Sequence, residues 1–167
     1  AADAKQAGFA DQQKALEQAQ AALEAAREAQ AGAEAEAETH AQARQAAEQH
    51  FGAAPDAVES TGSAGNHYAY KVRYPDRTLF FRADDGKIDD DYMVAEEHAM
   101  SLARGQGVPV PKVYVTDVTR KLIPVRYQFI EWLADPPLRK YDQEGTLERA
   151  AVGRQLGRHV ARWHRVK

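Results

Sequence analysis

The sequence has no cysteine and no large excess of charge of either sign. Without cysteine the chain cannot form a disulfide scaffold, a thiolate nucleophile or a cysteine zinc site. Lys and Arg number 22 against 25 Asp and Glu, a net charge of −3, and there is no basic stripe of the kind that binds nucleic acid. No apolar run approaches the roughly 20 residues that span a bilayer. We therefore expect a soluble, cytoplasmic protein that binds neither nucleic acid nor membrane.

Metal-ligating patterns are also missing. The six histidines are scattered, and the nearest pair, His159 and His164, misses the three- or four-residue spacing that puts two ligands on one helix face. Asp84, Asp85 and the acidic run 89–91 are typical of turns and helix caps rather than of metal sites. The sequence therefore predicts no metal ligand within the chain.

The chain has 167 residues, enough for about one domain of ordinary size. It opens on Ala-Ala-Asp without Met, and residues 163–167 continue a helical pattern with no capping Gly or Asn. We interpret it as part of a longer protein.

Residues 1–38 differ in composition from the rest. Sixteen of them are Ala, none is Pro, and eight acidic against three basic residues leave this segment at −5. The composition strongly favours a helix. Phe9, Leu16 and Leu23 recur every seven residues, a weak heptad pattern that ends near Gly32. A solvated single helix is the favoured interpretation, and self-association through residues 1–38 is the alternative.

The remainder of the chain alternates between helical and extended patterns. Helices are predicted at 40–51, 91–104 and 147–164, and strands near Val58 and at 67–74, 78–82, 112–118 and 125–131. Helices grouped beside a largely antiparallel sheet make an α+β domain. We divide the chain into a helical extension, a central domain and the start of a further helical segment, at 1–38, 39–138 and 139–167.

A loop at residues 61–66 separates the first two predicted strands. Its glycines let the backbone turn tightly and bring N–H groups close to phosphate oxygens. The candidate phosphate-binding residues are Thr61, Gly62, Ser63 and Gly65. The loop is neither a Walker A motif nor a full GxGxxG, so by itself it predicts only a turn.

Three further features follow in order. Arg82 ends the second hairpin strand, and Glu97 lies fifteen residues later on the predicted helix. Val-Pro-Val-Pro at 108–111 ends that helix and starts the next strand, because proline cannot continue a helix. Phe-Ile-Glu-Trp-Leu at 129–133 closes the last predicted strand.

In this order the features resemble the N-terminal, nucleotide-binding lobe of the aminoglycoside phosphotransferase and choline kinase-like family, over about residues 41–166. The resemblance implies a protein-kinase-like N-lobe, an antiparallel sheet of about five strands with one helix packed on it. It also implies a phosphotransferase that uses ATP or GTP with Mg²⁺ on a small hydroxyl-bearing molecule. The catalytic and metal-binding aspartates of such an enzyme would lie outside this chain, which would be inactive alone.

The resemblance assigns roles to individual residues. The loop and Arg82 would contact the nucleotide phosphates, and Glu97 would pair with Arg82 and orient it. The hinge residues that would take the base are Glu131, Trp132 and Leu133. Apolar surface around the hinge and on the helix that carries Trp163 should be exposed, since a second lobe would face it.

Two alternatives stay open from the sequence. Arg82 stands where the family usually has lysine, and Lys71 on the neighbouring strand is an alternative phosphate contact. The other function considered is a non-catalytic interaction protein, in which the helical segment mediates self-association and the α+β domain is a kinase-like scaffold.

Overall fold

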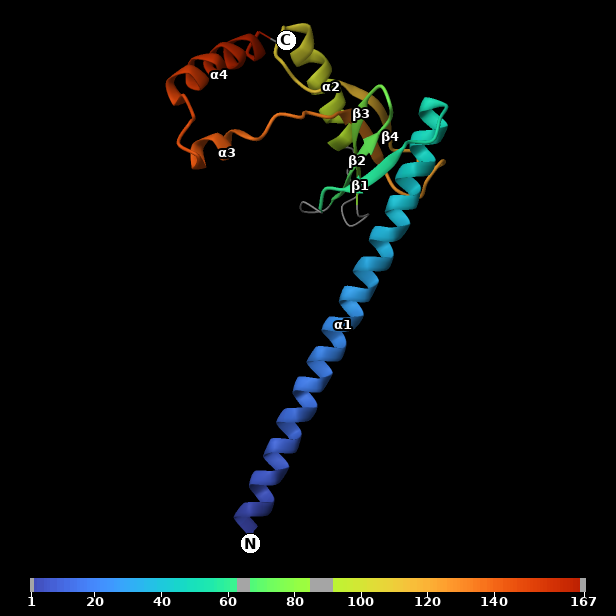
Figure 1. Ribbon diagram of the computed structural model, residues 1–167, viewed down its shortest axis with the longest axis vertical. Helices are drawn as coiled ribbons and strands as arrows, with labels where there is room; N and C mark the ends of the chain where they lie inside the picture. Colours follow the sequence, from blue (N-terminus) through green and yellow to red (C-terminus); the bar gives the residue numbers. More distant parts are fainter. Residues whose placement is uncertain (1, 63–66, 85–91, 166–167) are drawn as a thin grey trace. The chain divides into compact units, whose positions relative to one another are not determined.

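The computed structural model describes residues 2–62, 67–84 and 92–165, with side chains from residue 13 onward (Figure 1). The chain forms two compact units, Ala1–Thr39 and His40–Lys167. Helix α1 (Ala2–Phe51) makes up the first unit and continues into the start of the second. Across the described ranges, no helix is both long enough and apolar enough to cross a membrane.

Helix α1 is continuous, whereas the sequence predicted two helical stretches, 1–38 and 40–51. Its Ala, Gln and Glu residues favour a helix, and Gly32 costs only about 1 kcal/mol relative to Ala. The helix ends at the predicted cap, Gly52, whose φ of +76° is readily adopted by glycine. The Gly52 N–H donates to the carbonyl of Glu48 at 2.9 Å, which closes the last turn.

Among the described residues of the second unit, five strands form one antiparallel sheet. They are β1 (Ala57–Ser60), β2 (His67–Arg73), β3 (Thr78–Asp84), β4 (Val113–Asp117) and β5 (Tyr127–Glu131), in the spatial order β1-β2-β3-β5-β4. The predicted hairpin is β2 and β3, closed by a turn in which the Tyr74 N–H donates to the Arg77 carbonyl at 2.8 Å. Strand β3 continues past Arg82, which therefore lies inside the strand and not at its end.

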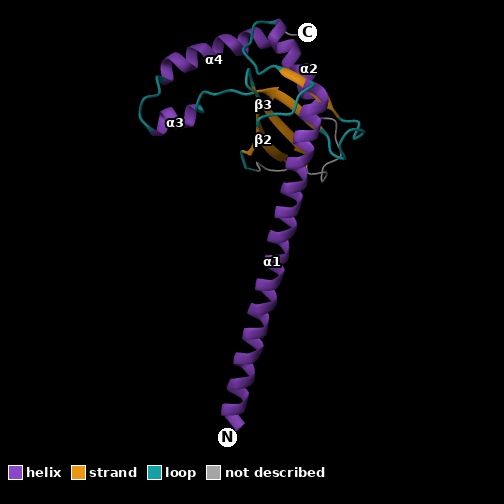
Figure 2. Ribbon diagram, turned by 45° about the vertical axis from the view of Figure 1, so that its right-hand side comes forward, coloured by secondary structure: helices purple, strands orange, loops and turns teal. Residues whose placement is uncertain are grey.

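The described part of the second unit also contains three further helices (Figure 2). They are α2 (Tyr92–Gly105), between β3 and β4 in the chain, and α3 (Leu138–Gln143) and α4 (Arg149–Trp163), which follow β5. Helix α3 was not predicted, because six residues are too few to show a helical period. The five antiparallel strands with one helix between the third and fourth confirm the predicted α+β, kinase-like N-lobe.

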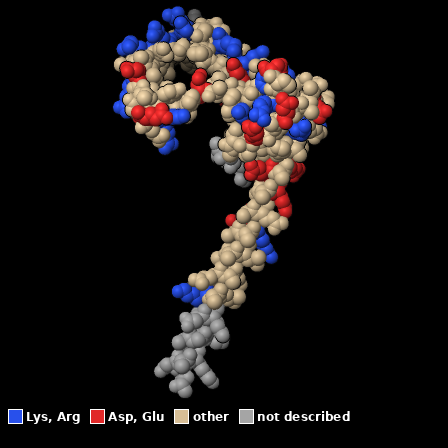
Figure 3. Space-filling model, viewed as in Figure 1, with Lys and Arg blue, Asp and Glu red and all other residues tan. Residues whose placement is uncertain are grey.

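Helix α4 carries the exposed apolar stripe that the sequence predicted. Leu156, Val160 and Trp163 are 60%, 45% and 39% exposed and lie three or four residues apart, on one face of the helix. Figure 3 shows Lys and Arg gathered over the same helix. Helix α4 is therefore amphipathic, with its apolar face open to solvent in this structure.

The two faces of the sheet have different partners, because side chains alternate along each strand. Leu79, Phe81 and Ala83 of β3 are fully buried against the last turns of α1. The other buried members of this core are Ala43, Ala46, Ala47, Tyr70, Val72, Tyr74, Ile123, Tyr127 and Phe129. The rings of Phe81 and Phe129 are 5.0 Å apart. The alternate residues of β3, Phe80 and Arg82, lie on the opposite face of the sheet.

Polar contacts also join the end of α1 to the sheet. The Tyr127 hydroxyl donates to Asp117 Oδ2 at 3.1 Å, and His50 Nε2 lies 2.7 Å from the same hydroxyl. Burial raises the pKa of Tyr127, and the Asp117 carboxylate raises it further, so the hydroxyl remains a donor at neutral pH. Residues 40–51 are thus part of the sheet domain in both its apolar and its polar contacts.

The packing of α1 on the sheet gives a prediction for one pair of alanines. Ala46→Leu should lower the free energy of unfolding by about 1–3 kcal/mol, because Ala46 is fully buried and a larger side chain must displace the core. Ala41→Leu, on the exposed face of the same helix, should change it by less than about 0.5 kcal/mol. Urea denaturation measures both values, and equal effects would contradict this packing.

Candidate functional site

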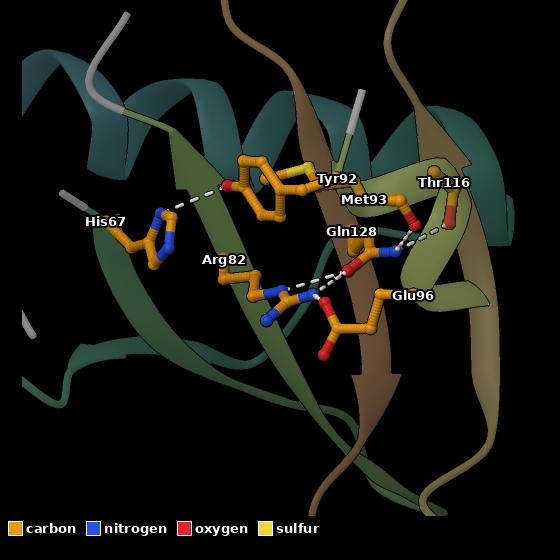
Figure 4. Close-up of polar contacts among 7 residues, drawn as sticks. All are labelled: His67, Arg82, Tyr92, Met93, Glu96, Thr116 and Gln128. Carbon is orange, nitrogen blue, oxygen red and sulfur yellow. Dashed lines mark hydrogen bonds and ion pairs between the residues drawn. The ribbon is translucent and has the colours of Figure 1, made fainter. Parts of the chain in front are cut away.

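Arg82 lies on the sheet face opposite the α1 core, with its side chain only 16% exposed. Its Nε donates to Gln128 Oε1 at 2.9 Å, and its Nη2 donates to the same oxygen and to Glu96 Oε2 (Figure 4). The other terminal nitrogen, Nη1, has no hydrogen bond to any residue that the structure describes. One edge of the guanidinium is therefore fixed and a further donor group remains available.

Gln128 is fully buried on β5, directly opposite Arg82 in the sheet register. Its Nε2 donates to the Met93 carbonyl at 2.9 Å and to Thr116 Oγ1 at 3.0 Å. Gln128 was not among the residues predicted from the sequence. The available signal was a glutamine between Tyr127 and Phe129, in the buried part of a strand that is otherwise Tyr, Phe and Ile, since a buried amide needs hydrogen-bond partners.

The predicted pairing of Arg82 with Glu97 is wrong: Arg82 pairs with Glu96. Each residue of a helix is rotated by about 100° from the previous one, so only one of two adjacent glutamates can face the sheet. Glu96 lies three residues after Met93, whose side chain is buried, and shares its face of α2. Glu97 is exposed and borders a separate depression, together with Arg104 and Lys112.

Burial lowers the pKa of the Arg82 guanidinium from its ordinary value. Because that ordinary value is so high, Arg82 is still a cation at neutral pH. A cation that is largely shielded from water and has one unused donor group is suited to hold an anionic ligand.

Arg82 borders a pocket of about 280 Å³ on this face of the sheet. Its lining residues are Phe80, Arg82, Glu96, Met100, Pro111, Ile130, Glu131, Trp132 and Leu133. The structure therefore brings together Arg82 and all three predicted hinge residues. Because Gln128 pairs with Arg82 and Glu131 pairs with Leu79, the start of the hinge lies three residues, or about 10 Å, along the strands from the cation.

The predicted hinge residues Glu131 and Leu133 differ in the hydrogen bonds that they already make within the protein. The Glu131 N–H donates to the Lys112 carbonyl at 2.7 Å, and the Glu131 carboxylate accepts the Lys112 N–H at 2.9 Å. Leu133 is 60% exposed and makes no hydrogen bond to any other residue in the described ranges. The backbone N–H and carbonyl of Leu133 are thus free to bind a ligand at the edge of the pocket.

Trp132 packs beside the pocket against Phe80, with ring centroids 6.2 Å apart. The Lys71 ammonium lies over the Trp132 ring, 5.2 Å from its centroid. Lys71 pairs with Phe80 across the sheet and therefore lies on the same face as Arg82. The structure thus places the alternative cation beside the hinge, while Arg82 lies further along the strands.

The loop after β1 is described only in part. The Thr61 N–H and hydroxyl both donate to the Ala69 carbonyl, at 2.9 and 3.0 Å, and Gly62 has a φ of +88°. Neither residue lines the pocket. Ser63 and Gly65 lie outside the described residues. The phosphate-binding role of the loop therefore stays a prediction.

The pocket combines apolar walls with a cationic group. Phe80, Met100 and Ile130 supply the apolar walls, and Arg82 supplies hydrogen-bond donors that carry positive charge. Within the described ranges, no group of three His, Asp or Glu side chains lies close enough to hold a metal ion. Asp84 forms a buried ion pair with Arg126, Oδ2 to Nε, at 2.5 Å. Asp85 and residues 89–91 lie outside the described residues.

Comparison with known proteins identifies the family. The model of the phosphotransferase enzyme family matches residues 57–167, and the chain belongs to this family. A crystal structure from Ralstonia eutropha JMP134, of a protein named as a candidate aminoglycoside phosphotransferase, is 24% identical, with a TM-score of 0.44. The similarity covers 57% of this chain and 28% of that protein. No curated protein matches the sequence.

The pairing of Arg82 with Glu96, and not with the adjacent Glu97, can be tested by measuring the stability of two variants. Glu96→Gln should lower the free energy of unfolding by about 1 kcal/mol, because it removes the carboxylate paired with a largely buried cation. Glu97→Gln makes the same chemical change one residue later and should alter it by less than about 0.5 kcal/mol, since Glu97 is exposed. Chemical denaturation of the two variants measures both, and a larger loss in Glu97→Gln would contradict the observed pairing.

Proposed function

We propose that the domain at 39–138 is the nucleotide-binding lobe of an ATP- or GTP-dependent phosphotransferase. One observation carries the proposal: a single pocket joins the Arg82 cation to the unbonded backbone of Leu133, with apolar walls between them. A purine nucleotide has the complementary sequence of groups, with a polar base edge, an apolar ring face and an anionic phosphate chain. Membership of the phosphotransferase enzyme family supports the same conclusion.

Each lining group then has a role. Leu133 hydrogen-bonds the edge of the base through its backbone, and Trp132 packs beside the ring. Arg82 contacts the phosphates through its available donors, held in place by Glu96 and Gln128. The loop at 61–66 supplies backbone N–H groups to the same phosphates, apart from the Thr61 N–H, which donates to the Ala69 carbonyl in this structure. Glu97 has no role in this arrangement.

Bound Mg²⁺ would neutralise the charge of the transferring phosphate group. We propose that its ligands, the catalytic base and most of the acceptor site lie outside the described residues, and that the chain by itself binds nucleotide without transferring phosphate. The acceptor would be a small hydroxyl-bearing molecule.

Titration with ATP and GTP, with and without Mg²⁺, tests the proposal, with Trp fluorescence and melting temperature as the signals. We expect saturable binding that Arg82→Ala weakens at least about tenfold, because a charge-assisted contact to phosphate is lost. Arg73→Ala is the matched control: Arg73 is an exposed arginine on the neighbouring strand, paired only with Glu59 in the described contacts. It should bind as the unmodified chain does.

Two results would argue against a nucleotide site. One is no saturable binding of either nucleotide by the intact chain. The other is equal weakening in Arg82→Ala and Arg73→Ala, which would indicate nonspecific attraction of an anion to positive charge.

A second function is favoured by the exposed side chains of α1. We propose that residues 1–38 mediate self-association, because Leu16 and Leu23 are 59% and 52% exposed and lie seven residues apart. Phe9, the first residue of the predicted heptad pattern, has no described side chain. In this role the helix would be an interaction segment, in addition to the proposed nucleotide-binding domain.

Sedimentation equilibrium tests the second function. We expect an oligomer at micromolar concentration that becomes a monomer in the double variant Leu16→Glu and Leu23→Glu, since charge in the seam opposes helix pairing. The control replaces Gln18 and Gln20, exposed residues of the same helix, by Glu and should leave the mass unchanged. A monomeric unmodified chain would rule out this role.

A further inference from the structure

We propose that Gln128 is a positioning residue, which holds Arg82 and the start of α2 in the arrangement that receives phosphate. The inference rests on the proposed function of the pocket. Gln128 does not line the pocket itself, and it acts on the ligand only through Arg82.

The orientation of the Gln128 amide is determined by its partners. The Met93 carbonyl can only accept a hydrogen bond, so the group 2.9 Å from it must be the amide nitrogen. The amide oxygen therefore points towards Arg82, where it accepts from both Nε and Nη2. An arginine donates only, so this pairing has no alternative with the amide reversed.

These contacts connect four elements of the domain (Figure 4). Gln128 belongs to β5, Arg82 to β3, Thr116 to β4 and the Met93 carbonyl to the first turn of α2. Glu96 lies three residues after Met93 on the same helix and completes the ring of contacts by accepting from Arg82. A displacement of α2 would thus change both acceptors of the guanidinium, directly through Glu96 and indirectly through Gln128.

A role in packing alone does not explain a glutamine at this position. The strand is otherwise Tyr, Phe and Ile at its buried sites, and Leu or Met would fill the same volume without a buried amide. The amide instead reduces the freedom of Arg82 before any ligand arrives. A cation fixed in advance loses less conformational entropy on binding, which strengthens its contact with phosphate.

The test compares ligands with and without phosphate. We expect Gln128→Leu to weaken ATP binding about tenfold and adenosine binding by less than about twofold, because only the phosphate contact depends on Arg82. The double variant with Arg82→Ala should bind ATP no more weakly than Arg82→Ala alone. Equal losses for ATP and adenosine, or additive losses in the double variant, would overturn the positioning role.

A destabilising control separates this role from general loss of structure. Val72 is fully buried on the opposite face of the sheet, in the α1 core. Val72→Ala should lower the melting temperature but leave the ratio of ATP to adenosine affinity unchanged. A shift of that ratio in Val72→Ala would show that stability alone controls phosphate binding, which also overturns the inference.

A measurement without nucleotide tests the positioning independently of the proposed function. We expect the Arg82 Nε–H to give a resolved ¹⁵N NMR signal, which is assigned by its absence in Arg82→Lys. Solvent exchange of this Nε–H should become at least about tenfold faster in Gln128→Leu. If exchange is faster in Gln128→Leu but the unmodified chain binds no nucleotide, the positioning role holds and the proposed nucleotide site is wrong. If exchange is unchanged in Gln128→Leu and the unmodified chain binds ATP, the positioning role is wrong and the nucleotide site holds.

Discussion

The site depends on the hydrogen bonds of the Arg82 guanidinium. Little water reaches this group, so protein side chains must accept hydrogen bonds from its N–H donors. Gln128 and Glu96 accept its hydrogen bonds from two different elements. Because Arg82 and Gln128 face each other in the β3–β5 register, a slip of one residue would turn one of them into the α1 core. The cost of a buried, unpaired cation therefore helps to specify the register of the central strands.

The opposite face of the same strands packs against the last turns of α1. Ala43, Ala46 and Ala47 let the last turns of α1 approach the aromatic side chains of β3 and β5 closely. These turns precede residues 57–167, which match the family, yet their burial shows that they complete the core. The sheet thus has an apolar face under α1 and a polar, pocket-bearing face beside α2.

The pocket draws on both local and distant parts of the chain. The predicted hinge residues 131–133 begin at the last residue of β5, so the strand that carries Gln128 also leads to the proposed base-binding edge. Phe80 and Arg82 come from β3, and Glu96 and Met100 come from α2. Side chains alternate along β3, so residues 80 and 82 share one face of the sheet. Strand β3 therefore connects the hinge end of the pocket with its Arg82 end. A base and a phosphate chain placed in this pocket would therefore contact one continuous surface.

The sequence by itself determined the order of the elements apart from the short helix α3, the α+β class and the family resemblance. These follow from local signals: alternation in the strands, the glycine at 52 and the prolines at 109 and 111. It also predicted Arg82 and residues 131–133 as site residues, and these line one pocket. Only the tertiary structure decided that Glu96 and not Glu97 meets Arg82, and that Gln128 joins them. The rotation of α2 about its axis is set by burying Met93 against the sheet, and no spacing along the chain contains that information.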